Sequence, residues 1–105
     1  MLSLLKGWRR HLKHLVEAVK KVEPRARVYL AGGAAEDRLT VLSDIDVLVV
    51  LPEKPGFNEA ARLRAAIWEE AENRGVPAYL PFQLHIIGRE DLERYRRSSK
   101  LIRLA

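Results

Sequence analysis

The chain has 105 residues, the length of one compact domain, and its 48% hydrophobic and 31% charged residues exclude an intrinsically disordered protein. It contains no cysteine, which excludes disulfides, thiolate metal sites and cysteine nucleophiles. The formal net charge is +5, and the ends of the chain are basic while its middle is acidic. An acidic middle suits a metal cation, and basic ends suit a polyanion such as a nucleotide or RNA. Solvated helix faces would give the same charge pattern.

The first predicted element is an amphipathic helix that begins at a cap on Ser3 and runs to about Val22, because apolar residues recur there every three or four positions. Pro24 ends this helix. The N-terminus lacks the order of charges and apolar residues of a secretory signal, and no run approaches the roughly 20 apolar residues of a membrane span. We therefore expect a soluble, cytoplasmic protein with no membrane contact.

Two strands follow the first helix. Residues 27–31 predict a short strand that runs into a turn at Gly32-Gly33, and residues 34–38 predict a brief helix or an irregular loop. Residues 45–51 predict the strongest strand in the chain, because they are β-branched and almost wholly apolar.

The second half predicts another helix, a third strand and a last short helix. The long helix is expected to begin at a cap on Asn58 and to end at Gly75. The strand covers residues 82–87, and the short helix covers about residues 89–97, followed by a loosely held basic tail. The whole chain, 1–105, is therefore predicted to be one α/β (α+β) domain with a small mixed sheet of about three strands and helices packed on it.

Two carboxylates mark the start of the strongest predicted strand. Asp44 and Asp46 are two positions apart, so their side chains point to the same side of the sheet. A hard divalent cation such as Mg²⁺ would offset their mutual repulsion. The alternative is that Asp44 caps a turn or that both are solvated, but an acid between Ile45 and Val47 is not what a purely structural strand needs.

The glycine pair adds a phosphate-binding hypothesis. Glycines allow backbone N–H groups to approach a phosphate closely, and Gly32-Gly33 precedes the acidic pair by ten residues, 34–43. If the two strands are neighbours, the glycines and the aspartates lie at the same sheet edge. A metal and backbone donors together are typical of phosphoryl or nucleotidyl transfer.

This region resembles the signature of the polymerase β-type nucleotidyltransferase superfamily, and in particular its minimal prokaryotic members. The resemblance lies in the glycine pair, the ten residues that follow it, and the segment 43–50, which is SDIDVLVV. The resemblance implies that Gly32 and Gly33 hold the triphosphate of ATP or another nucleoside triphosphate and that Ser43 lies beside it. It implies Asp44 and Asp46 as ligands of Mg²⁺, and transfer of a nucleotidyl group, usually AMP, to a hydroxyl. It further implies a helical partner of the HEPN type, as in toxin–antitoxin systems.

This sequence departs from the family pattern at two places. A third carboxylate usually stands on the next strand, where this chain has Gln83, whose carbonyl is a weak metal ligand and which cannot act as a base. His85 points to the same side as Gln83 and is the candidate base or replacement ligand, the alternative being a packed histidine. After the glycines, where many members carry arginines, only Arg38 remains as a phosphate contact.

Three other hypotheses stay open. Without the third carboxylate, the chain could bind nucleotide and neutralise its partner by binding alone. Nucleic-acid binding through the basic ends, with Tyr95 among arginines, is a further alternative, and exposed apolar positions would suit a homodimer. His11 and His14 are three apart on the first helix, but no carboxylate pattern supports a metal there, so we expect solvated histidines.

Overall fold

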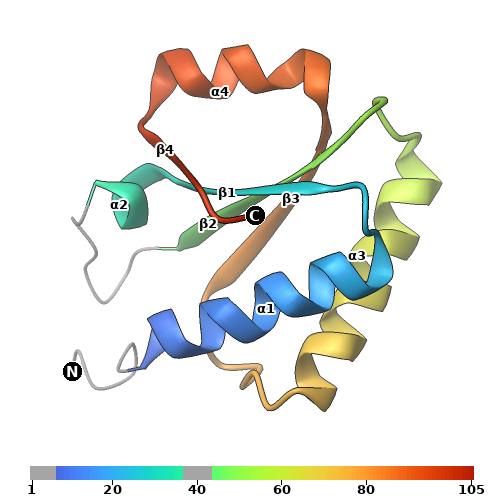
Figure 1. The fold of residues 1–105 in the computed structure, drawn as a ribbon, viewed down its shortest axis with the longest axis vertical. Helices are drawn as coiled ribbons and strands as arrows, with labels where there is room; N and C mark the ends of the chain where they lie inside the picture. Colours follow the sequence, from blue (N-terminus) through green and yellow to red (C-terminus); the bar gives the residue numbers. More distant parts are fainter. Residues whose placement is uncertain (1–6, 37–43) are drawn as a thin grey trace.

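The computed structural model of the protein describes residues 7–36 and 44–105. Within these residues one mixed sheet of four strands, in the order β3-β2-β1-β4, has helices on both faces (Figure 1). The elements in chain order are α1 (Trp8–Val22), β1 (Arg27–Ala31), α2 (Gly32–Ala35), β2 (Ile45–Leu51), α3 (Phe57–Asn73), β3 (Phe82–Gly88), the 3-10 turn η2 (Arg89–Asp91), α4 (Leu92–Ser98) and β4 (Leu101–Arg103).

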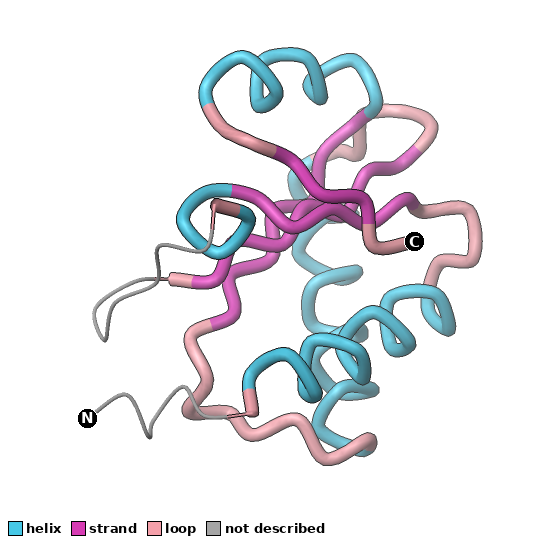
Figure 2. The backbone as a smooth tube through the Cα atoms, turned by 60° about the vertical axis from the view of Figure 1, so that its left-hand side comes forward, coloured by secondary structure: helices cyan, strands magenta, loops and turns pink. Residues whose placement is uncertain are grey.

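The helices form two layers around the sheet. The larger hydrophobic cluster joins α1 and α3 to one face, while α4 covers part of the other face (Figure 2). Because side chains alternate along a strand, each strand contributes to both layers. The smaller cluster, beneath α4, consists of Tyr29, Ala31, Leu48, Val50, Ile87 and Leu92. None of the helices in the described part of the chain is both long enough and apolar enough to cross a membrane.

Strand β2 lies in the interior of the sheet. It pairs antiparallel with β1 and parallel with β3, and α3 makes the crossover between the two parallel strands. Both faces of β2 are covered, which explains its almost unbroken apolar sequence. Asp46 is its one residue that is not buried, so this carboxylate marks the place where the strand meets solvent.

Helix α1 packs through the apolar stripe that the sequence predicts. Trp8, Leu12, Leu15 and Val19 are buried and recur at spacings of three and four. The helix begins after Gly7, whose φ is +79°. The predicted cap at Ser3 lies outside the described residues.

Two predictions about the later elements are wrong. The long helix begins at Phe57, after Gly56, so Asn58 is inside its first turn and does not cap it. The basic tail is not loosely held, because β4 pairs with β1 as a fourth strand. The main chain of Val28 extends this pairing, since its N–H donates to the carbonyl of Ala105 at 3.0 Å and its carbonyl accepts from the N–H of Leu104 at 2.7 Å.

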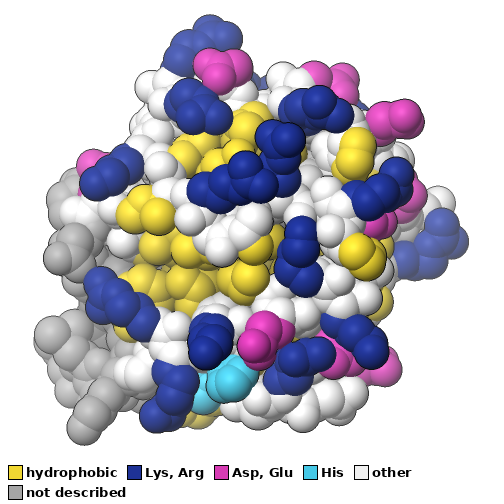
Figure 3. Space-filling view, viewed as in Figure 1, with side chains coloured by type: hydrophobic (Ala, Val, Ile, Leu, Met, Phe, Trp, Pro, Cys, Tyr) yellow, Lys and Arg dark blue, Asp and Glu magenta, His cyan; other side chains and the backbone are white. Residues whose placement is uncertain are grey.

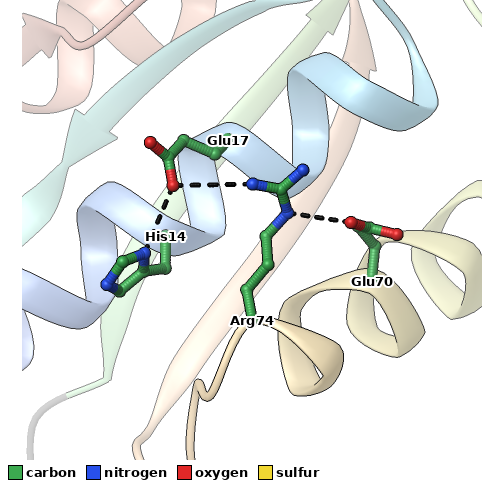
Figure 4. Close-up of polar contacts among 4 residues, drawn as sticks. All are labelled: His14, Glu17, Glu70 and Arg74. Atoms are coloured by element: carbon green, nitrogen blue, oxygen red, sulfur yellow. Dashed lines mark hydrogen bonds and ion pairs between the residues drawn. The ribbon is translucent and has the colours of Figure 1, made fainter.

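Helices α1 and α3 are also joined by a polar network at the surface (Figure 4). Arg74 donates to Glu70 at 2.8 Å and lies 3.6 Å from Glu17, which in turn contacts His14 at 3.2 Å. His14 is therefore an exposed histidine with a carboxylate partner. His11 is half-buried, and its Nδ1 atom is buried without a hydrogen-bond partner among the described residues, so this histidine is only partly solvated.

Candidate functional site

The centre of the candidate site is Asp46, near the beginning of β2. In the sheet register Asp46 lies opposite Ala31, the last residue of β1, and opposite Gln83 of β3. Because β1 and β2 are antiparallel neighbours, the end of one and the start of the other meet at the same sheet edge. The two strands are therefore neighbours, as the hypothesis of a shared edge for the glycines and the aspartates requires. Helix α2, which begins with the glycine pair, lies at this edge in Figure 1.

The Asp46 carboxylate is held by a histidine. Its Oδ1 atom lies 3.1 Å from Nε2 of His85, two strand positions beyond Gln83. An ionised carboxylate can only accept, so the His85 ring donates this hydrogen bond. About a third of each side chain is exposed, 33% for Asp46 and 29% for His85. The structure thus places His85 at the predicted site, and its direct contact there is with the acid.

The second oxygen of Asp46 lies against the main chain of Gly32. This glycine has φ of +66°, and a Cβ atom built on it would lie 2.8 Å from Oδ2. Glycine is therefore needed at this position both for its backbone conformation and for the approach of the carboxylate. The predicted glycine turn is the first turn of helix α2, which is anchored by the buried Ala34 and Ala35.

The remaining predicted residues lie around this edge or outside the described residues. Asp44 is exposed and directly precedes β2, where the N–H of Ile45 donates to the carbonyl of Pro81 at 2.8 Å. Gln83 is exposed beside Asp46 on the neighbouring strand. The predicted phosphate contacts Arg38 and Ser43 lie in the segment 37–43, which the structure does not describe.

A pocket of about 230 Å³ opens beside Asp46. Its wall is shared between the sheet edge and the end of α4, and its lining residues are Ala31, Gly32, Asp46, Leu48, His85, Tyr95, Ser98 and Ser99. The Tyr95 ring packs at a tilt against His85, with ring centroids 6.1 Å apart. Sequence reasoning did not place the α4 residues at the site, because only the tertiary packing of α4 on the sheet brings them there.

The described residues at this edge supply only part of the ligand set of a divalent metal. Among residues 7–36 and 44–105, no group of three or more histidine, cysteine, aspartate or glutamate side chains could hold a metal ion. Two carboxylates and a neighbouring amide oxygen are nevertheless hard oxygen donors, and Mg²⁺ is commonly held by one or two carboxylates together with substrate phosphates. The residues present therefore fit a metal that binds together with a nucleotide.

The fold is nucleotidyltransferase-like: a mixed sheet with helices on both faces carries aspartates at one edge, beside a helix that begins with two glycines. A family model described as nucleotidyltransferase domain matches residues 12–102, so the chain belongs to this family, whose domains use a divalent metal and a nucleoside triphosphate. A solved structure described as a "putative nucleotidyltransferase" shares 27% sequence identity with a TM-score of 0.59, covering 90% of this chain and 98% of that one. Among curated proteins, none matches the sequence.

Proposed function

We propose that this domain transfers a nucleoside monophosphate, AMP from ATP, to a hydroxyl group of an acceptor in the presence of Mg²⁺. The observation that carries the proposal is the placement of Asp46, with one carboxylate oxygen bonded to His85 and the other against the side-chain-free Gly32. This arrangement fixes the carboxylate at the wall of the pocket. In the proposed function, residues 1–105 form one minimal nucleotidyltransferase domain.

In the proposed reaction Asp44 and Asp46 would hold the metal, which would neutralise phosphate charge when bound. Gly32 and Gly33 bring backbone N–H groups close to the triphosphate, since the amides of a first helical turn have no acceptor within the helix. Arg38 and Ser43 are proposed as further phosphate contacts. The amide oxygen of Gln83 is a weak additional ligand.

The chemical step exchanges one phosphorus–oxygen bond for another. The acceptor hydroxyl oxygen bonds to the α-phosphorus, while the bond from that phosphorus to pyrophosphate breaks and pyrophosphate leaves with the electron pair. The hydroxyl proton passes to Nδ1 of His85, the ring nitrogen that does not donate to Asp46, because Gln83 has no basic atom to take it. His85 thereby supplies what a third carboxylate would supply in the family pattern.

The proposed acceptor is a protein partner of the helical HEPN type in a toxin–antitoxin pair. The support for this partner is the resemblance of the sequence to minimal nucleotidyltransferases. A direct test is to incubate the domain with radiolabelled ATP, Mg²⁺ and the product of its adjacent gene. Wild-type protein and the control Glu59→Gln, an exposed acid on α3, should label the partner, whereas Asp44→Asn with Asp46→Asn should not. Equal labelling by the double variant would reject the proposal.

The second candidate is a nucleotide-binding antitoxin that neutralises its partner without efficient transfer. Gln83 beside Asp46 favours it, because the strand position opposite the metal ligand lacks a carboxylate. Calorimetry separates the two candidates: Mg·ATP binding and tight partner binding without turnover would support the nucleotide-binding antitoxin.

Nucleic-acid binding through the basic ends is a third candidate, and it predicts RNA affinity that falls steeply with salt. On the face of the molecule drawn in Figure 3, Lys and Arg side chains are spread out and do not form one basic stripe. This face therefore gives no support to the nucleic-acid candidate.

A further inference from the structure

Three arginines line one small pocket at the end of the sheet opposite Asp46. The pocket has a volume of about 100 Å³, and its lining residues are Arg25, Arg27, Val50, Leu51, Pro52 and Arg89. The arginines come from the turn after α1, the first residue of β1 and the first residue of η2. The sheet register explains their meeting, because Arg27 pairs with Val50, and Leu51 pairs with the residue directly before Arg89.

This pocket is separate from the candidate site. Strand β2 rises roughly 3.3 Å per residue, so Asp46 and Leu51 lie about 16 Å apart along it. Figure 1 shows the same separation, since α2 and the start of β1 lie at opposite ends of the sheet. The two pockets share no lining residue. A nucleotide bound beside Gly32 therefore does not account for the three arginines.

The pocket gathers positive charge, and no acid is among its lining residues. Arg27 and Arg89 are exposed, and within residues 7–36 and 44–105 neither has a carboxylate partner. Arg25 contacts Glu23 at 3.4 Å through Nε, which leaves the donors of its terminal nitrogens for an anion. Its side chain is 74% exposed, so this ion pair is weak. Three guanidinium groups around one small space repel each other, and an anion between them would offset the repulsion.

The residue type and the size of the pocket point to a phosphate group. Guanidinium groups bind phosphate oxygens through two parallel hydrogen bonds, a geometry that lysine does not offer. The pocket is smaller than the roughly 300 Å³ of the smallest typical small-molecule sites, so it suits one anionic group rather than a whole nucleotide.

We propose that Arg25, Arg27 and Arg89 form a binding site for one phosphate group, either a free phosphate ion or the terminal phosphate of a nucleic-acid strand. The site lies outside the proposed catalytic centre, and it requires no nucleotide at the Asp46 edge. It therefore stands or falls independently of the proposed function.

The test is a titration of the isotope-labelled protein with sodium phosphate, followed by backbone amide NMR, with sodium chloride of equal ionic strength as the reference. The amide signals of Arg27, Leu51 and Arg89 should shift with phosphate and not with chloride. Arg27→Gln and Arg89→Gln should each weaken phosphate binding about tenfold, as expected for a lost contact to a charged group. Arg62→Gln, which removes an exposed arginine of α3 outside this pocket, is the matched control and should bind like the wild type.

A variant that gains affinity makes the test independent of any loss of folding. Glu23→Gln keeps the oxygen that accepts from Arg25 and removes the negative charge beside it, so phosphate should bind severalfold more tightly. The source of the phosphate is identified with a short RNA strand that carries either a phosphate or a hydroxyl at its end. A preference for the phosphorylated strand that disappears in Arg89→Gln identifies a strand end. Equal binding of the two strands, together with binding of free phosphate, identifies the free ion.

Three results would refute the site. The first is that neither phosphate nor the phosphorylated strand shifts the amides of Arg27, Leu51 and Arg89. The second is that Arg27→Gln and Arg89→Gln bind phosphate as tightly as Arg62→Gln. The third is an unchanged affinity in Glu23→Gln, which would show that Arg25 takes no part. Thermal unfolding of each variant checks that the fold is retained.

Discussion

Replacing Gly32 by alanine should damage nucleotide binding far more than it damages the fold. Its φ of +66° costs a non-glycine residue roughly 1–2 kcal/mol. The new Cβ would also lie 2.8 Å from Oδ2 of Asp46, which must then turn away. Because Oδ1 of the same carboxylate is bonded to His85, this rotation breaks the 3.1 Å bond that orients the proposed metal ligand.

Gly75→Ala is the matched control, because it separates backbone strain from crowding. Gly75 has φ of +90°, and among the described residues no atom lies within 4 Å of a Cβ built on it. Both variants should therefore lose about 1–2 kcal/mol of unfolding free energy in urea titrations. Only Gly32→Ala should lose Mg·ATP affinity, by at least about tenfold, since misplaced metal ligands commonly cost 10–100-fold. Wild-type affinity in Gly32→Ala, or an equal loss in Gly75→Ala, would refute the reasoning.

Three further predictions concern stability. Gly88→Ala should lower the free energy of unfolding by about 1–3 kcal/mol, because its Cβ would meet backbone atoms of Lys54 at 2.6 and 2.7 Å; an unchanged urea midpoint would contradict this. Burial lowers the pKa of His11 from its ordinary value of 6.5. As the pH falls, the His11 ring therefore takes up a proton in the unfolded chain before it does so in the folded one, and the free energy of unfolding should decrease below about pH 6.5. His11→Gln should reduce that fall, measured by urea unfolding at pH 7.5 and 5.5, and an identical pH dependence would count against it. Arg74→Ala should cost no more than about 1 kcal/mol, because its ion pairs are partly exposed, and a loss above about 2 kcal/mol would show that the network does more than we infer.

The elements with strong local patterns could be predicted from the sequence. The stripe of α1, the apolar run of β2 and the helix end at Gly75 each follow from residue spacing or backbone conformation. Strand β4 could not be predicted this way, because three residues with a basic side chain carry too little pattern. Its pairing depends on β1 being available some 70 residues earlier in the chain, which is tertiary information.

In the candidate site too, the features that depend on local spacing could be predicted, and those that depend on tertiary packing could not. Strand alternation predicts that Gln83 and His85 share a side of the sheet, but the hydrogen bond from His85 to Asp46 requires the register between β2 and β3. The crowding of Gly32 against Asp46 is likewise a property of the folded sheet edge. The contribution of α4 to the pocket has no local signal, since Tyr95 lies among arginines that predict a solvated helix end.

The most direct test of the account is a crystal structure with a non-hydrolysable ATP analogue and Mn²⁺, which replaces Mg²⁺ and is located by its anomalous scattering. The account predicts a metal peak bound by oxygens of Asp44 and Asp46, with the triphosphate along the Gly32 main chain. A metal and nucleotide bound elsewhere, or aspartates that do not share the ion, would contradict the proposed site.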